Sequence, residues 1–296
     1  MSIKHLQIFV NVYKESSITA AAKKLGITQP AASQAIRELE THYSVKLFER
    51  AGRGICKTEA ANRLYEYAVH ISALYSEMEH DFGQNCQPEQ LRIGSSISVG
   101  TCLMPYYISN FVRQFHVPIP YLKIDSSDII EQFVLHNQVD FAVIEGNIHS
   151  DKILCEPLME DSLIAVCSRL HPLAAKESVT TADIKEEHFL LREKNSGTRE
   201  LIDSAFLLHD ILINPLWEST STTAIINAVT ANIGISILPE RLVAPYLKQK
   251  KIVKVNLKDI EFTRTYNIVY HQNKYLTSDI MNFLNFMKEN NPDPKA

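Results

Sequence analysis

The stretch that decides the fold of the N-terminal part is residues 17–39, SITAAAKKLGITQPAASQAIREL. Its first half carries apolar residues at i, i+4 and i+7, the spacing of one buried helix face. These residues are Ile18, Ala22 and Leu25. Ser17 is a suitable N-cap for this helix. The helix is expected to end at Gly26, because glycine adopts the left-handed conformation of a helix end at little cost.

A second helix is predicted after a short turn. Thr28 is its expected N-cap, and Pro30 falls in its first turn, where a missing N–H costs little. The inward face is Ala32, Ala35, Ile36 and Leu39. The outward face is Gln29, Pro30, Ser33, Gln34 and Arg37. Two helices joined by a turn that contains glycine predict a helix-turn-helix, whose second helix enters the major groove of DNA.

The outward residues suit DNA. The amides of Gln29 and Gln34 can bond to an adenine edge, while Ser33 and Arg37 suit bases or phosphates. The start of the helix at Thr28 also favours phosphate. A three-helix packing module with polar outward residues is the alternative.

The sequence on both sides extends this unit. A first helix is predicted from apolar residues at i, i+3, i+4 and i+7, namely Leu6, Phe9, Val10 and Tyr13.

Two short apolar runs at 45–50 and 51–55, joined by a turn with glycines, predict a two-stranded wing. Arg50 and Arg53 fall near its tip, in reach of the DNA backbone or minor groove. An exposed basic hairpin is the alternative.

Charge separates this head from the rest of the 296-residue chain. Residues 1–64 hold ten Lys or Arg against five Glu, a net +5, which leaves −9 for the other residues because the whole chain is −4. A basic head on an acidic body favours a polyanionic partner for the head alone.

A long helix is predicted next, because the sequence has no Pro or Gly between Thr58 and Gly83. Apolar residues are spaced as in the seam of a coiled coil, which predicts pairing with a second chain. This seam is Leu64, Ala68, Ile71, Tyr75, Met78 and Phe82. Packing of the helix on its own domain is the alternative.

From residue 91 short β-rich runs alternate with helical ones, which predicts an α/β fold with mainly parallel sheets. The predicted strands are 91–94, 121–124, 139–144, 163–167, 189–191, 234–238 and 266–270. The predicted helices are 104–115, 129–136, 199–208, 222–231 and 278–288.

Three junctions of this body are rich in hydroxyls, at 95–98, 196–199 and 219–223. Hydroxyls and free N–H groups at helix starts bind anions, so these junctions and Arg199 favour an anionic small molecule in a cleft between two lobes. N-caps without a ligand are the alternative at each junction.

The head resembles the DNA-binding domain of the LysR-type transcriptional regulators. The matching segments are Phe9-Val10, Ala21-Ala22 with Leu25, 29–33, Ile36, Leu39-Glu40, 47–50 and 58–60. The family commonly has Arg where this chain has Gln34 and Gly where it has Ala61. The first departure bears on base preference and the second on a helix start.

The body resembles the periplasmic-binding-protein-like effector domain of the same family, through 92–94, Asp140, Pro157-Leu158 with Asp161, 171–173, 196–199, Gly234-Ile235 and Leu238-Pro239. The resemblance implies effector binding between the lobes near Ser96, Ser98, Gly146, Ser196, Thr198 and Thr222. Glu145 would repel an anion if its carboxylate faced the cleft.

The predicted organisation follows. It comprises a winged helix-turn-helix at 1–58, a dimerisation helix at 59–83, a hinge at 84–90 and an effector domain at 91–296. Lobe I is expected at about 91–161 and 266–296, and lobe II at about 162–265. The resemblance implies dimers that often assemble to tetramers, double-stranded DNA and RNA polymerase as partners, a small effector and no cofactor.

Other function classes leave weaker signals. No run is long enough for a membrane span and the start lacks a signal peptide, which indicates a cytoplasmic protein. Catalytic motifs are missing, so an enzyme is a minor alternative beside a metabolite-binding module that never contacts DNA. A thiol switch is a third alternative. The five scattered cysteines have no paired spacing, so neither disulfides nor a metal site is expected.

Overall fold

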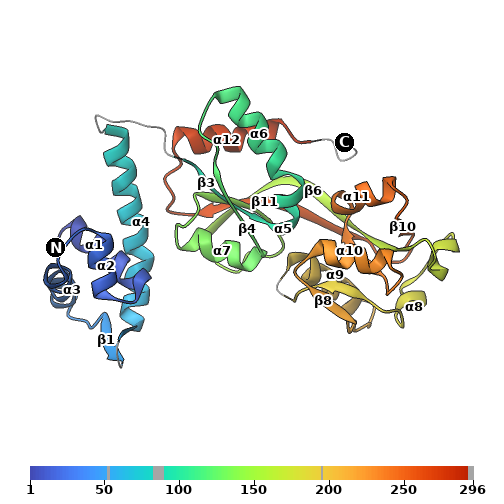
Figure 1. The fold of residues 1–296 in the computed structure, drawn as a ribbon, viewed down its shortest axis with the longest axis horizontal. Coiled ribbons are helices and arrows are strands. Elements are labelled where there is room, and N and C mark those ends of the chain that lie inside the picture. The colour runs from blue at the N-terminus through green and yellow to red at the C-terminus, as the bar shows by residue number, and fades with distance from the viewer. Residues whose placement is uncertain (52–53, 83–89, 195, 293–296) are drawn as a thin grey trace. The chain divides into compact units, whose positions relative to one another are not determined.

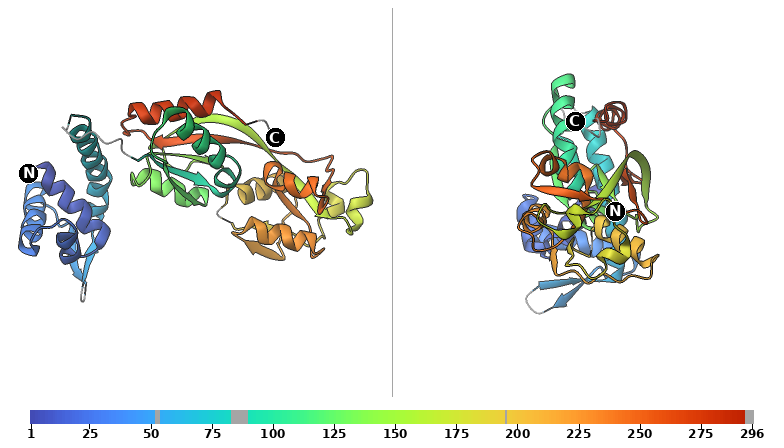
Figure 2. Two further views of the ribbon diagram at one scale, coloured as in Figure 1. Left: turned by 45° about the horizontal axis from the view of Figure 1, so that its top comes forward. Right: turned by 90° about the vertical axis from the view of Figure 1, so that its right-hand side faces the viewer.

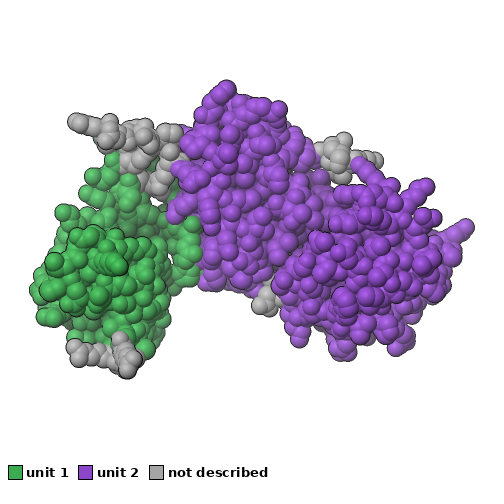
Figure 3. All heavy atoms as spheres, in the orientation of Figure 1, with its two compact units in different colours: residues 1–88, 135–138, 273–275 green, residues 89–134, 139–272, 276–296 purple. Residues whose placement is uncertain are grey.

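The computed structural model describes residues 1–51, 54–82, 90–194 and 196–292. The chain divides into two compact units, residues 1–88 with 135–138 and 273–275, and the remaining residues (Figure 3). Among the described residues, no helix is both long and apolar enough to cross a membrane.

The first unit contains the predicted helix-turn-helix (Figure 1). Its elements are α1 (Ile3–Glu15), α2 (Ile18–Lys24), α3 (Gln29–Tyr43), β1 (Phe48–Ala51), β2 (Gly54–Lys57) and α4 (Glu59–Phe82). Both predicted caps are confirmed, since the Ser17 hydroxyl accepts from the N–H of Ala20 and the Thr28 hydroxyl from that of Ala31. Gly26 has a φ of +65°, the left-handed conformation predicted for the end of α2. The inward face of α3 is buried as predicted, at Ala32, Ala35, Ile36 and Leu39.

The cap of α3 leads to a first testable prediction. In Thr28→Ala the N–H of Ala31 loses its acceptor, so we expect α3 to lose about 1 kcal/mol of protection against opening. Amide hydrogen exchange across residues 29–43 in the full chain measures this loss. Thr41→Ala is the matched control, because that hydroxyl only donates to the Arg37 carbonyl within the helix. Equal effects of the two substitutions would contradict a capping role.

The wing forms as predicted, with β1 antiparallel to β2 and Arg50 opposite Ile55. Glu40 of α3 anchors its start, because the carboxylate accepts from the N–H of Leu47 at 2.8 Å and from Lys46 Nζ at 3.0 Å. Burial acts to raise the pKa of Glu40, but these hydrogen bonds outweigh it and lower the pKa. The carboxylate therefore stays charged and fixes the wing to α3.

Helix α4 has the predicted length, but one face of its first half is buried within the chain. Ala61, Tyr65, Ala68 and Val69 are buried in one core with α1 and α3, and Leu64 packs against that core. The Tyr65 ring stacks on Tyr13 with centroids 3.9 Å apart. The prediction that Ala68 forms an interchain seam is therefore corrected, because its side chain is fully buried within the chain.

From Tyr67 onward α4 exposes an apolar stripe in a shifted register. We call this the outer stripe, and its members are Tyr67, Ile71, Leu74, Met78 and Phe82. Ile71, Met78 and Phe82 belong to the predicted seam, whereas Tyr75 is only partly exposed. The predicted hinge at 84–90 lies, apart from Gln90, outside the described residues.

The second unit consists of two lobes joined by two long strands (Figures 1 and 2). Lobe I contains β3 (Arg92–Ser96), α5 (Ile97–Cys102), α6 (Met104–Phe115), β4 (Tyr121–Asp125), α7 (Ser127–Leu135), β5 (Phe141–Glu145) and α12 (Ser278–Glu289). Lobe II contains the 3-10 helix η1 (Pro172–Ala175), α8 (Thr181–Ile184), β7 (Leu190–Arg192), α9 (Gly197–Leu207), β8 (Trp217–Ser219), α10 (Thr222–Thr230), β9 (Ser236–Pro239), α11 (Glu240–Lys248) and β10 (Ile252–Val255). The long strands β6 (Ile153–Ser168) and β11 (Phe262–His271) pair along their length and run through both lobes.

The prediction of mainly parallel sheets is wrong. In the described chain a seven-stranded sheet has the order β10-β6-β11-β5-β3-β4, with β9 also paired to β6. Only its pairs β3–β4 and β3–β5 are parallel, whereas every pair made by β6 or β11 is antiparallel. The two long strands account for this difference, because β11 lies between β5 and β6 and runs opposite to both, and β6 also runs opposite to β9 and β10.

Each lobe has its own core. In lobe I, Phe111 of α6 packs on Phe283 of α12 with ring centroids 4.5 Å apart. In lobe II, Phe206 of α9 packs against Phe189 and Phe262. Because these cores are separate, only β6 and β11 and the facing surfaces of the lobes set the geometry of the space between them.

Candidate DNA interface and effector cavity

The outward face of α3 carries the side chains predicted to contact DNA. Gln29, Pro30, Gln34 and Arg37 are exposed and Ser33 is half-buried. Gln29 Nε2 donates to Ser33 Oγ at 2.8 Å, which orders the first turn. No ion pair engages Arg37 among the described residues, so its guanidinium can bind phosphate or guanine.

Glu38 is a member of this face that the sequence analysis missed. Its carboxylate accepts from Gln34 Nε2 at 3.0 Å and contacts His5 Nε2 at 2.8 Å. The hydrogen bond from Gln34, followed by that from His5, lowers the pKa of Glu38. Glu38 therefore orients the amide of Gln34. Of the predicted wing contacts, Arg50 lies in β1 with its side chain outside the described part, and Arg53 lies outside the described residues.

A closed polar cluster joins the lobes at the centre of the second unit, and we call it the interlobe cluster. Its members are Ser96, Glu145, Asp161, Thr198, Arg264 and Tyr266. Arg264 of β11 lies at its middle, with Nη1 3.3 Å from Glu145 Oε1 and Nη2 2.8 Å from Asp161 Oδ2. Nη1 also donates to Thr198 Oγ1 of lobe II at 2.9 Å.

The interlobe cluster shows what Glu145 does. The Glu145 carboxylate does not repel a ligand across an open cleft, because it is 4% exposed, accepts from Ser96 and pairs with Arg264. Burial opposes the charge on Arg264, but Glu145 and the other acidic groups outweigh burial and raise the pKa of the guanidinium. Burial also raises the pKa of Tyr266 well above its usual range, so its hydroxyl stays protonated and donates to Asp161 at 2.7 Å.

Two glycines let the lobes touch beside this cluster. A Cβ on Gly197 would lie 2.8 Å from the carbonyl oxygen of Glu145, and one on Gly146 would lie 3.1 Å from Gly197 Cα. Gly146 also has a φ of +96°, which side chains disfavour. The predicted effector residues Gly146, Ser196 and Thr198 therefore belong to a packed contact between the lobes.

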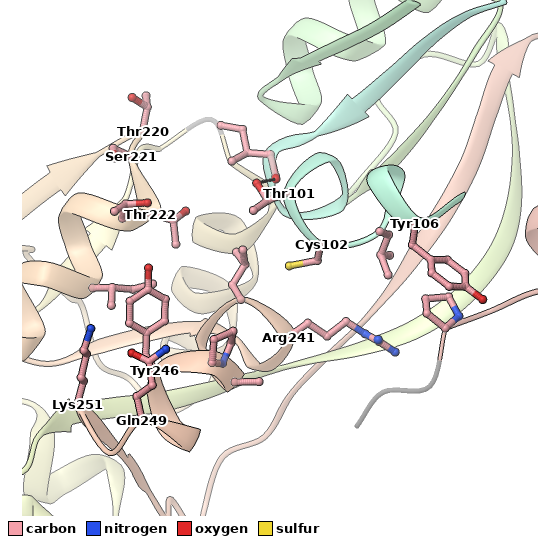
Figure 4. Close-up of a pocket in the computed structure, with 18 residues that line it drawn as sticks. Thr101, Cys102, Tyr106, Thr220, Ser221, Thr222, Arg241, Tyr246, Gln249 and Lys251 are labelled. Carbon is pink, nitrogen blue, oxygen red and sulfur yellow. Dashed lines mark hydrogen bonds between the residues drawn. The ribbon is translucent and has the colours of Figure 1, made fainter. Parts of the chain in front are cut away.

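The open space between the lobes is a separate cavity of about 850 Å³ (Figure 4). Lobe I contributes α5 and the start of α6, and lobe II contributes α10 and α11. The residues that carry its polar groups are Thr101, Cys102, Tyr106, Thr220, Ser221, Thr222, Thr223, Arg241, Tyr246, Gln249 and Lys251. Of the predicted effector residues only Thr222 lines this cavity.

The other predicted effector positions are placed differently. Ser96 binds Glu145, Ser196 caps α9 by accepting from the N–H of Arg199, and the buried Ser98 hydroxyl has no hydrogen-bond partner in the described structure. Arg199 is 3% exposed and pairs with Asp203 and Glu218 inside lobe II, so it does not line the cavity. Among the residues that sequence reasoning missed are both cations that line the cavity, Arg241 in α11 and Lys251 after it. No helix was predicted at α11, which contains Pro245.

The cysteines in apolar surroundings have raised pKa values. Burial raises the pKa of Cys102 to about 11, and it raises the pKa of Cys167 to about 11 as well. Because the thiolate is the reactive form, both thiols are unreactive near neutral pH. These two residues therefore give no support to the alternative of a thiol switch.

Within the part of the chain that the structure describes, one group of side chains has metal-ligand chemistry. Asp128, His149 and Glu200 offer ligand atoms within 4.8 Å of one another. The imidazole of His149 contacts the buried carboxylate of Glu131 at 3.1 Å, and this contact raises the pKa of His149. Exposed acidic groups of this kind are common without an ion, so we assign no metal to this group.

Comparison with known proteins matches both units to one family. The model of the bacterial regulatory helix-turn-helix protein, lysR family, matches residues 3–62, and that of the LysR substrate binding domain matches residues 87–292. The HTH-type transcriptional regulator YeiE of Escherichia coli (strain K12) is 30% identical over 97% of each chain.

Solved structures share the fold. A full-length OxyR variant from Pseudomonas aeruginosa gives a TM-score of 0.79 at 20% identity, covering 97% of this chain and 95% of that one. The effector binding domain of QuiR in complex with shikimate gives 0.63 at 20% identity, covering 69% and 97%. The two matched domains and the relative at 30% identity place the chain in the LysR family of bacterial transcriptional regulators.

Proposed function

We propose that this regulator binds its DNA sites as a homodimer, or as a dimer of dimers, and that a small anionic effector in the interlobe cavity modulates that binding. The observation that carries the DNA part is α3, whose apolar face is buried and whose N-terminal polar face is exposed. No cofactor and no catalytic step enter the proposal. RNA polymerase is the proposed partner at the promoter.

The outer stripe of α4 supports pairing of two chains. Its five apolar side chains are each at least 45% exposed, and they recur every three or four residues along one helix face. Such a face is buried when two α4 helices pack together, and a twofold dimer presents two α3 helices to two half-sites.

The cavity supports control by a ligand. Its walls come from both lobes, so a ligand that contacts both walls favours one lobe arrangement over another. Two observations favour an anion, namely the start of α10 at Thr222 and the cations Arg241 and Lys251. Shikimate, the ligand of the QuiR domain, is itself a carboxylate. We propose that the change in lobe arrangement alters the spacing of the α3 helices and hence the bend of the bound DNA.

Fluorescence anisotropy tests the DNA part of the proposal. The probe is the DNA immediately upstream of the protein's own gene, titrated at several salt concentrations beside a shuffled probe. We expect nanomolar binding, a specificity ratio of roughly 10³ or more and a steep salt dependence. Equal and weak binding to both probes would contradict specific recognition of this DNA. Electrophoresis of bent fragments, with and without candidate anions, then tests the effector part.

A further inference from the structure

Gln34 and Glu38 form a hydrogen-bonded pair on the exposed side of α3. They lie one helical turn apart, and Gln34 Nε2 donates to Glu38 Oε1 at 3.0 Å. Both side chains are exposed, whereas Ala35, Ile36 and Leu39 on the opposite side of the helix are buried. The pair is therefore accessible to DNA on the second helix of the helix-turn-helix.

Glu38 is held in place by a second contact, which comes from α1. Its Oε2 lies 2.8 Å from Nε2 of His5, and Nδ1 of the same ring accepts from the backbone N–H of Ser2 at 3.1 Å. A backbone N–H can only donate, so Nδ1 is the unprotonated nitrogen and Nε2 carries the hydrogen that Glu38 accepts. Each carboxylate oxygen of Glu38 thus has its own donor, which restrains the carboxylate beside Gln34.

The bond to Glu38 changes what the Gln34 amide can offer to a base. A glutamine amide has two N–H donors and one acceptor oxygen. A carboxylate only accepts, so Glu38 engages one N–H of Gln34 and leaves the oxygen and the other N–H. The side chain of Gln34 makes no other hydrogen bond within the described residues. One donor and one acceptor therefore remain for DNA.

One donor beside one acceptor matches the edge of adenine. In the major groove adenine presents its N6 amino group as a donor and N7 as an acceptor, whereas guanine presents two acceptors, O6 and N7. An unrestrained glutamine amide can donate both N–H groups to guanine, but Gln34 has only one left. Cytosine N4 and thymine O4 each satisfy only one of the two remaining groups.

We propose that Glu38 is a specificity-determining residue of this regulator, because it holds the Gln34 amide so that the amide selects adenine over guanine at the base pair that Gln34 faces. Glu38 acts through Gln34 and is therefore a positioning residue, and His5 supports it from α1. The inference rests on the proposed function, since it requires α3 to read DNA bases.

Selection of binding sites from a library of random DNA duplexes tests the inference with the full-length protein. Sequencing of the bound pool gives the base preference at each position. The wild type is expected to prefer adenine over guanine by roughly tenfold or more at the position that Gln34 reads. Gln34→Ala is expected to remove that preference, which identifies the position. Glu38→Ala is expected to reduce the ratio there to about threefold or less and to leave the other positions unchanged.

A matched variant controls for charge. Removal of a carboxylate from the head strengthens binding to all sequences alike, so only the ratio of adenine to guanine reports the position of the Gln34 amide. Glu59→Ala removes the same charge from an exposed position of α4 and is expected to leave every base preference unchanged.

Three results would overturn the inference. The first is an adenine preference that Glu38→Ala leaves unchanged. The second is a loss of preference spread evenly over all positions, because it would indicate a general role in folding. The third is that Gln34→Ala alters no position, or one at which the wild type prefers guanine. These results leave the proposed function standing, whereas a wild type that enriches no sequence would overturn both.

Discussion

Arg264→Met is expected to destabilise the second unit by about 3–5 kcal/mol, the usual cost of removing one partner from a buried ion pair. The guanidinium neutralises both Glu145 and Asp161, whose side chains are 4% and 2% exposed. Methionine keeps much of the volume but leaves two carboxylates close together without a cation. The hydrogen bond from Arg264 to Thr198 is lost at the same time, which loosens the link between the lobes.

Urea unfolding followed by tryptophan fluorescence measures this effect, because Trp217 of lobe II is the only tryptophan of the sequence. Arg113→Met is the matched control, since Arg113 lies on the exposed surface of α6 and its loss is expected to change stability by less than about 0.5 kcal/mol. Glu145→Gln combined with Arg264→Met is expected to recover part of the loss. Stability of the single variant within about 1 kcal/mol of the wild type would show that the cluster does not need its cation.

The double substitution Ser33→Ala, Arg37→Ala is expected to weaken specific DNA binding by about 10²-fold or more. A base or phosphate contact by arginine is worth about 1–3 kcal/mol, and a dimer loses it at both half-sites. Ser33 also holds the Gln29 amide at 2.8 Å, so its removal frees a second side chain of the recognition face. Folding is expected to be unaffected, because Arg37 is exposed and Ser33 is not part of the buried core.

Anisotropy titrations at several salt concentrations measure this loss, and the salt dependence is expected to become shallower. Arg63→Ala removes the same charge from an exposed position of α4 and is the matched control. A loss no larger than that of the control would mean that charge, and not the position of Arg37 on α3, determines affinity. Ligand binding to the second unit is expected to stay unchanged, which separates a regulator from a module that never contacts DNA.

The sequence predicts the first unit well because its signals are local. The caps at Ser17 and Thr28, the turn at Gly26 and the buried face of α3 all depend on residues within a few positions of one another. The length of α4 follows in the same way from the absence of Pro and Gly. The burial of Ala68 could not be predicted, because it depends on packing against α1, a helix more than fifty residues earlier in the sequence.

The interlobe region is predicted less well because it is assembled from distant segments. Arg264 contacts Thr198 and Asp161, which lie 66 and 103 residues away in the sequence, and Glu145, which is farther still. No short sequence motif therefore predicts the cluster. The hydroxyl-rich junctions were a correct signal for helix starts, since Ser196 and Ser221 cap α9 and α10. They did not reveal which starts face open space, because that depends on how closely Gly146 and Gly197 let the lobes approach.

The burial of Ala61, Tyr65, Ala68 and Val69 sets the smallest part of the chain that can fold as a DNA-binding head. A truncation at residue 58 would remove these side chains and expose Phe9, Val12 and Leu39 to water. A truncation after α4 would keep the hydrophobic interior whole. The same packing fixes the first half of α4 to the head. We therefore expect any rotation of α4 at residue 70 to turn α3 by the same angle.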